Sequence, residues 1–202
     1  GLPNAVEEEL GTDPNDADSD DDGLDDGVEV EGGDPFKYDE GIDTDPRLKD
    51  TDADGLSDFE ELERGTNPLL RDTDTDGIED REEVLRIALG VNPLDKDSDD
   101  DGVLDGFEVE PWLDSDGDGF INAADPDSDN DELPDGVEVG TRTLFTDPDQ
   151  DGPLSATDIG RGFARRDADP SSQTNPLDPD SDDDGILDGK EDLNHNGMLD
   201  PL

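Results

Sequence analysis

Apolar residues are sparse along this chain and recur at one fixed place in a polar repeat. In five places a single apolar residue follows a glycine within the pattern Asp-x-Asp-x-Asp-Gly-apolar-x-Asp-x-x-Glu. These residues are Leu24, Leu56, Ile78, Val103 and Ile186. Glycine lets a chain reverse at positive φ, so each copy predicts a tightly turning loop rather than a strand or a long helix.

A short helix is predicted after the glycine of each loop. Residues 58–64 are followed by Gly65, and residues 80–89 are followed by Gly90. Glycine after the last turn is the expected end of a helix. The segment 80–89 places Val84, Leu85, Ala88 and Leu89 on one side and predicts the longest helix of the chain.

A proline lies four residues before the first aspartate of each of the five loops. Because the residue before proline avoids the α region, these segments predict extended or turned connectors. Each unit therefore consists of a connector, a loop and a short helix. The prolines are Pro14, Pro46, Pro68, Pro93 and Pro176.

The spacing of the carboxylates is not explained by composition. The residue frequencies of this chain give roughly 0.01 expected matches to the four Asp, one Gly and one Glu of the motif, whereas the sequence contains five. We therefore interpret the positions 1, 3, 5, 7, 9 and 12 of each loop as functional. In the five intact loops these are Asp18, Asp20, Asp22, Leu24, Asp26 and Glu29; Asp50, Asp52, Asp54, Leu56, Asp58 and Glu61; Asp72, Asp74, Asp76, Ile78, Asp80 and Glu83; Asp97, Asp99, Asp101, Val103, Asp105 and Glu108; and Asp180, Asp182, Asp184, Ile186, Asp188 and Glu191.

Four further segments are variants of the loop. One has Glu132 in place of the glycine, so it is expected to be strained or differently shaped. Two end in Asp and move the apolar residue one place on, to Ile121 and Leu154, and the fourth begins near the end of the sequence. Their candidate ligands are Asp127, Asp129, Asp131, Leu133, Asp135 and Glu138; Asp114, Asp116, Asp118, Phe120 and Asp125; Asp147, Asp149, Asp151 and Asp158; and Asp192, Asn194, Asn196, Met198 and Asp200.

Composition and charge raise the alternative of disorder. The chain has 202 residues, 27% hydrophobic residues and a formal net charge of −52. Such a chain cannot bury enough apolar surface to offset its conformational entropy, and its like charges repel. An acidic tail for basic partners or a salt-adapted surface would also need many carboxylates, but neither would require this spacing. With no cysteine, disulfides cannot hold the chain together, and no apolar run reaches the roughly 20 residues that span a bilayer.

The ligand chemistry favours calcium. Carboxylates at positions 1, 3 and 5 point at one centre, the seventh residue offers its carbonyl, position 9 acts directly or through water, and the final Glu can bind with both oxygens. This set supplies the six to eight oxygens that Ca²⁺ prefers, whereas Mg²⁺ demands a smaller octahedron. Softer metals lack ligands, because the chain has one histidine and no cysteine.

The loops and their connectors resemble bacterial, cysteine-free thrombospondin type 3 repeats. The resemblance lies in Asn-Pro-Leu followed by the loop, over residues 67–83, 92–108 and 175–191. Residues 114–125 and 147–158 are closer to dockerin loops, and all are EF-hand-like. The family implies an extracellular or cell-surface setting and a fold organised by ions, with roughly one or two Ca²⁺ per loop.

Several other features have ordinary explanations. His195 occupies an outward-facing place in the last loop, and Trp112 is expected to form a small local core with Phe107, Val109 and Leu113. Arg161, Arg165 and Arg166 form a basic cluster, expected either to make salt bridges between repeats or to dock an acidic neighbour. Residues Gly1, Leu2, Asn4 and Glu7 match the second half of a loop, so both ends look cut within a repeat; the ligands that these partial loops lack would come from a longer chain or from neighbours in an assembly.

We predict one tandem array over residues 1–202, interrupted by irregular insertions at about 31–45 and 141–172. The expected fold class is a mostly irregular, calcium-stabilised, solenoid-like repeat array with short helices and turns, little strand and no large hydrophobic core. Units are expected to contact one another through shared ions. The expected function is a calcium-rigidified extracellular rod, spacer or filament, without enzymatic activity.

Two alternative functions remain open. One is a calcium-dependent linker or binding module of a larger secreted adhesin or hydrolase, and the other is a calcium store or mineral-nucleating protein. Expected partners are calcium ions and either further copies in a head-to-tail assembly or neighbouring domains. No nucleic-acid partner and no membrane span are expected.

Overall fold

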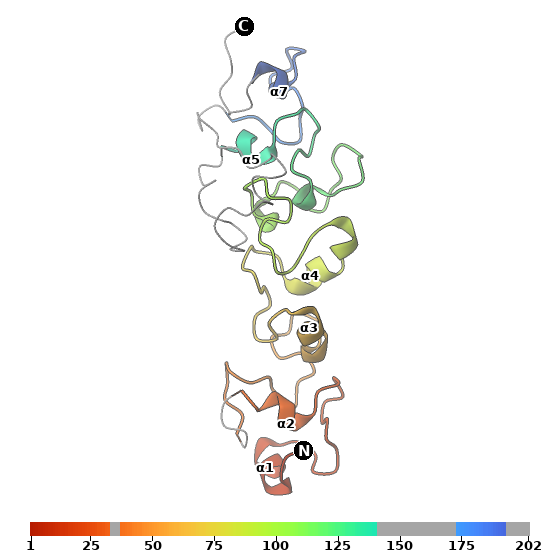
Figure 1. Cartoon of the computed structure of the whole chain (residues 1–202), viewed down its shortest axis with the longest axis vertical. Helices are drawn as coiled ribbons and strands as arrows, with labels where there is room; N and C mark the ends of the chain where they lie inside the picture. The colour runs from red at the N-terminus through yellow and green to blue at the C-terminus, as the bar shows by residue number, and fades with distance from the viewer. Residues whose placement is uncertain (33–36, 141–172, 193–202) are drawn as a thin grey trace. The chain divides into compact units, whose positions relative to one another are not determined.

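The computed structural model describes residues 1–32, 37–140 and 173–192. These residues form turns and irregular segments with short helices, and β-structure in this part of the chain is limited to an isolated bridge between Glu40 and Asp43. The predicted fold class, an irregular repeat array with short helices and little strand, is thereby confirmed (Figure 1).

Each α-helix begins at position 9 of its loop. In α3 the Ser57 side chain accepts a hydrogen bond from the Glu60 backbone N–H, and Gly65 ends the helix at φ 89°. A capping box and a left-handed glycine thus define both ends. The α-helices are α1 (Asn4–Leu10), α2 (Asp26–Glu29), α3 (Asp58–Arg64), α4 (Asp80–Val84), α5 (Asp135–Glu138) and α7 (Asp188–Glu191); the 3-10 turns are η1 (Ile87–Leu89), η2 (Asp105–Phe107) and η3 (Asn122–Ala124).

The predicted helix over residues 80–89 is wrong in length. α4 ends at Val84, and the chain continues through 3-10 turns in which Arg86 N–H donates to the Glu83 carbonyl and Leu89 N–H donates to the Arg86 carbonyl. Leu85 is 65% exposed. Short helices depend on packing of their apolar face, and this face has little to pack against.

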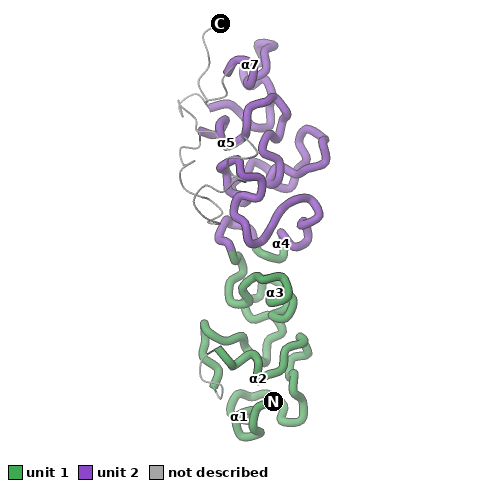
Figure 2. The backbone as a smooth tube through the Cα atoms, in the orientation of Figure 1, with its two compact units in different colours: residues 1–73, 79–82 green, residues 74–78, 83–202 purple. Residues whose placement is uncertain are grey.

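The chain divides into two compact units (Figure 2). Unit 1 comprises residues 1–73 and 79–82, and unit 2 comprises residues 74–78 and 83–202. The boundary between the units falls within the loop formed by residues 72–83.

The interior of each unit contains more acid than hydrocarbon. The largest fully buried side chains include Glu61, Glu83 and Glu138. The seventh loop residues supply much of the small apolar core. Among the described residues this core is Val30, Leu56, Ile78, Val91, Val103, Ile121, Ala123, Leu133 and Val137.

Trp112 belongs to a small core, but with other members than predicted. It packs with Val91, Ile121 and Ala123, and its ring centroid lies 4.1 Å from the guanidinium carbon of Arg86. The expected neighbours Phe107, Val109 and Leu113 are exposed. Buried Ile121 does occupy the apolar place that the sequence assigned to it.

Candidate metal centres

The first half of each loop is organised by hydrogen bonds from backbone N–H groups to aspartate. In the loop formed by residues 50–61, Gly55 N–H donates to Asp50 Oδ2 at 2.9 Å, and Asp54 N–H donates to Asp52 Oδ1 at 3.1 Å. Leu56 N–H donates to Asp54 Oδ1 at 2.6 Å. The chain is thus wrapped around its own carboxylates, as the spacing predicts.

These carboxylates converge. One oxygen each of Asp50, Asp52 and Asp54 lies within 4.8 Å of the others. The same holds in two other intact loops, for Asp18, Asp20 and Asp22 and for Asp97, Asp99 and Asp101. A further buried cluster joins Asp76 and Glu83 to Asp105 of the following loop.

The twelfth residue brings a buried carboxylate with unsatisfied oxygens. Glu61 is 0% exposed, and neither of its carboxylate oxygens has a hydrogen-bond partner. Glu29 and Glu138 each have one such oxygen, and so do the third-position residues Asp52 and Asp129. Buried polar atoms are nearly always paired, and an unpaired buried charge is costly. These oxygens therefore fit a cation.

The pKa values of these buried glutamates reflect the same cost of burying an unpaired charge. Burial, followed by the nearby charges of Asp52, Asp54 and other loop carboxylates, raises the pKa of Glu61 to about 9. Burial and neighbouring aspartates likewise raise the pKa of Glu29 to about 8 and that of Glu138 to about 10. Without a cation, these carboxylates cannot all be ionised together at neutral pH.

Lysine and arginine do not neutralise the converging carboxylates of the loops at 18–29 and 50–61. Among the described residues, ion pairs join Arg47 to Asp45, Arg71 to Glu79, Lys37 to Asp39 and Lys190 to Glu132, and none includes a ligand carboxylate of these two loops. The hard, all-oxygen donor set suits Ca²⁺.

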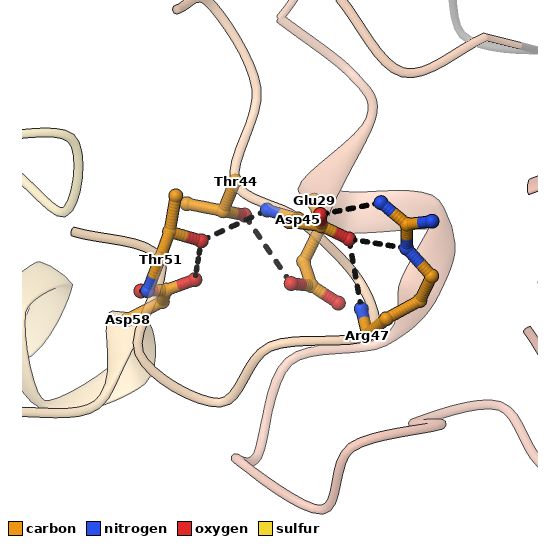
Figure 3. Close-up of polar contacts among 6 residues, drawn as sticks. All are labelled: Glu29, Thr44, Asp45, Arg47, Thr51 and Asp58. Atoms are coloured by element: carbon orange, nitrogen blue, oxygen red, sulfur yellow. Dashed lines mark hydrogen bonds and ion pairs between the residues drawn. The ribbon is translucent and has the colours of Figure 1, made fainter. Parts of the chain in front are cut away.

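The ninth aspartate braces the loop, a role that the sequence analysis missed. Thr51 donates to Asp58 twice, from its backbone N–H to Oδ1 at 2.8 Å and from its hydroxyl to Oδ2 at 2.6 Å. The Thr51 hydroxyl also accepts from the Asp45 N–H at 2.9 Å (Figure 3). The brace thus links connector, loop and helix, while direct metal ligation by position 9 stays a prediction.

The backbone part of the brace recurs in six loops, and its hydroxyl part is made by Ser19, Thr51, Thr73 and Ser98. A Ser or Thr occupies position 2 of each intact loop. This regularity was visible in the sequence and is the signal that could have revealed the brace. The backbone N–H of the second residue donates to the ninth carboxylate in the pairs Ser19–Asp26, Thr51–Asp58, Thr73–Asp80, Ser98–Asp105, Ser128–Asp135 and Ser181–Asp188.

Two positions of each loop are left-handed, not one. Besides the sixth residue, the fourth has positive φ, as in Ala53 (65°) and Thr75 (70°). Glu132 takes φ 87°, and its N–H donates to Asp127 Oδ2 at 3.1 Å, as the glycines of other loops do. Glu132 is therefore in a strained conformation, as predicted, but its loop keeps the common shape.

The variant loop at 114–125 is more open than the others. Asp114 and Asp118 are exposed and Asp116 is half-buried, whereas Asp125 is buried and near them: burial, together with Asp118 and Asp116, raises its pKa to about 6. The loop at 180–191 keeps the common turn, with Gly185 N–H donating to Asp180 Oδ2 at 2.8 Å, although Asp180 is only half-buried and Asp182 and Asp184 are exposed.

The partial loop at the start of the sequence also has the predicted second half. α1 begins at Asn4, Glu7 is buried, and Gly11 donates to the Glu7 carbonyl at 2.8 Å. The candidates outside the described residues are Asp147, Asp149, Asp151, Asp158, Asn194, Asn196, Met198 and Asp200, together with His195 and the three arginines of the basic cluster. Ligation by the seventh carbonyls stays a prediction.

This geometry defines a class: a tandem array of loops with converging oxygen ligands that could hold cations. The family model of the bacterial TSP3 repeat matches residues 1–17, 50–70 and 72–96. These three segments, about a third of the chain, match the bacterial TSP3 repeat, and the resemblance seen in the sequence is confirmed. TSP3 repeats bind calcium, and the acidic clusters of this chain fit that ion.

No curated protein matches the chain. Within the described part of the chain, every helix is too short and too polar to cross a bilayer.

Proposed function

We propose that this chain is a structural element of the cell exterior, a rod, spacer or filament segment whose shape is held by calcium. The observation that carries the proposal is the set of buried loop carboxylates with unpartnered oxygens, above all Glu61. At neutral pH such groups stay ionised in a folded chain only when a cation completes them.

Calcium would supply the folding free energy that the apolar core lacks. The buried apolar residues are few, whereas the net charge is −52. Because the ligands of one loop come together only when the chain is folded, the free energy of binding becomes free energy of folding. The metal-free chain is therefore expected to be largely unfolded at neutral pH.

The extracellular setting in this proposal follows from the modest calcium affinity expected of such loops. Millimolar extracellular calcium can fill loops of modest affinity, and cytosolic calcium cannot. The carboxylates that could serve as catalytic acids or bases are assigned to ions in this proposal, so no enzymatic activity is proposed.

Circular dichroism and small-angle X-ray scattering during a calcium titration, reversed with EDTA, test the proposal. We expect a cooperative gain of helix signal and a fall in radius of gyration, and Mg²⁺ at the same concentration should not replace calcium. A chain equally compact in EDTA would refute it. Weak, non-cooperative binding without a change of fold would favour a calcium store instead.

Electron microscopy of the calcium-loaded chain distinguishes a filament from a spacer. Regular end-to-end assemblies support a filament segment. Monomers alone leave the spacer role and exclude self-assembly.

A further inference from the structure

The fifth aspartate of a loop makes hydrogen bonds to two different loops. Asp22 accepts from the Leu24 N–H of its own loop through Oδ1 at 2.7 Å. Through Oδ2 it accepts from the Phe59 N–H, 37 residues further on, at 2.9 Å. Phe59 is position 10 of the next intact loop. We name the second contact the inter-loop bond.

The inter-loop bond recurs within each unit with the same atoms. In every case the donor is the backbone N–H of position 10 in one loop and the acceptor is Oδ2 of position 5 in an earlier loop. Besides the Phe59–Asp22 bond, the pairs are Arg81 to Asp54 at 3.0 Å, Gly136 to Asp101 at 2.5 Å and Gly189 to Asp131 at 2.6 Å.

Close packing at these junctions is visible in the glycines as well. A Cβ on Gly106, position 10 of its loop, would lie 2.6 Å from the backbone carbonyl oxygen of Asp76 in the preceding loop. Where position 10 carries a side chain, as Phe59 does, that side chain lies over the glycine of the preceding loop, here Gly23. Position 10 therefore packs against an earlier loop at the same place, whether the residue is glycine or carries a side chain.

The donor has a particular place in the next loop. Position 10 is in the first turn of the helix that begins at position 9, where backbone N–H groups have no partner within the helix. The same short helix carries the ninth and twelfth carboxylates, Asp58 and Glu61 in the case of α3. The inter-loop bond thus positions half of the candidate ligands of the next site.

Among the loops that the structure describes, the loop at 114–125 lies outside this series. Asp101 bonds to Gly136 and so passes over the loop at 114–125. Asp118, the fifth residue of that loop, accepts from Phe120 N–H at 2.9 Å, and within the described residues no N–H of a following loop donates to it. This loop provides an internal comparison, because it has the position-5 carboxylate without the inter-loop bond.

From these contacts we infer that the fifth aspartates couple cation binding between successive loops, so that the loops fill cooperatively, whereas the loop at 114–125 fills independently. The inference rests on the proposed calcium binding. A cation in the loop at 18–29 orients the Asp22 carboxylate, which then holds α3 and its ligands in place. By linkage, a cation in the loop at 50–61 favours the first site equally.

The test is a residue-resolved calcium titration by NMR of the whole chain, following the amides of Gly23, Gly55 and Gly119. Asp22→Asn keeps one carbonyl oxygen and the size of the side chain but removes an anionic acceptor. We expect it to raise the calcium midpoint of the loop at 50–61 about fivefold or more, although every residue of that loop is unchanged. Asp118→Asn, the matched control, should affect only its own loop.

The outcomes separate the two proposals. If Asp22→Asn shifts only the loop at 18–29, calcium binding stands and the coupling is refuted. If no loop of the wild-type chain responds to calcium, both fail. Should Asp22→Asn not fold, Asp101→Asn provides the same comparison in unit 2, with the amides of residues 127–138 as the readout.

Discussion

Replacing Thr51 with valine tests the brace between connector, loop and helix. Valine has nearly the shape of threonine, so packing is kept and the hydroxyl alone is lost. Two hydrogen bonds disappear: the one that the hydroxyl donates to Asp58 Oδ2 at 2.6 Å and the one that it accepts from Asp45 N–H at 2.9 Å. Both partners belong to buried residues.

The magnitude follows from the two bonds. A hydrogen bond to a charged group contributes about 1.5–3 kcal/mol and a neutral one about 1 kcal/mol. Thr51→Val should therefore lower the stability of the calcium-saturated chain by about 3 kcal/mol. Urea denaturation in excess calcium measures the loss, and hydrogen exchange of the Asp45 amide shows whether it arises at the brace.

Two controls make the result interpretable. Thr51→Ser keeps the hydroxyl and should cost less than 1 kcal/mol. Ser115→Ala changes the second residue of the loop at 114–125, where this hydroxyl makes no hydrogen bond within the described residues and the ninth residue is Asn122, which bonds instead to the Val109 carbonyl. If Thr51→Val costs no more than Ser115→Ala, the brace does not stabilise the loop.

Three changes test the charge and strain of the sites. In EDTA the pKa values of Glu29 and Glu61 are raised in the folded chain, so the folded chain binds more protons than the unfolded chain between about pH 4.5 and 9. The free energy of unfolding therefore falls as pH rises through this window. The helix signal should increase from pH 8 to pH 5, and a pH-independent signal would contradict this. Glu61→Gln should stabilise the metal-free fold by about 1–3 kcal/mol, because glutamine is neutral without having to take up a proton when it is buried. It should also weaken calcium binding about tenfold, so a urea titration in EDTA and a calcium titration must give opposite signs. Glu132→Gly should stabilise the calcium-loaded chain by about 1 kcal/mol by relieving the strain at φ 87°, and a thermal midpoint that does not rise would count against that strain.

Local structure could be predicted from the sequence because local residues determine it. Gly55 and the alternating aspartates of its loop are sufficient for the turn, and the helix that follows begins at position 9 and ends at Gly65, as the sequence indicates. The left-handed fourth residues, such as Ala53, escaped prediction because no glycine marks them. The loop imposes that conformation through its hydrogen bonds.

Contacts between loops could not be predicted from spacing. The bond between Phe59 and Asp22 depends on how two loops stack, and the intervening segment has no fixed length in the repeat. The overestimated helix at 80–89 has the same origin. Its apolar side was visible in the sequence, but the absence of a surface to cover it was not.

Segments can be inserted between loops because a threonine after the insertion bonds to the twelfth-position glutamate, as a threonine does in a repeat without an insertion. In an uninterrupted repeat the Thr66 hydroxyl donates to the Glu61 backbone carbonyl, five residues back, at 3.5 Å. Thr174 lies 36 residues after Glu138 and donates to its carboxylate Oε1 at 2.9 Å.

Lengthening a closed segment from 5 to 36 residues costs only about 2 kcal/mol of chain entropy. A hydrogen bond to a carboxylate contributes a similar free energy. This contribution is larger than that of the long hydrogen bond to a neutral carbonyl, which the threonine makes in a repeat without an insertion. Thr44 makes the corresponding bond to Glu29 Oε1 at 3.3 Å (Figure 3). In both places the glutamate keeps its second oxygen unpartnered, so an inserted segment can be closed without withdrawing the oxygen that faces the candidate cation.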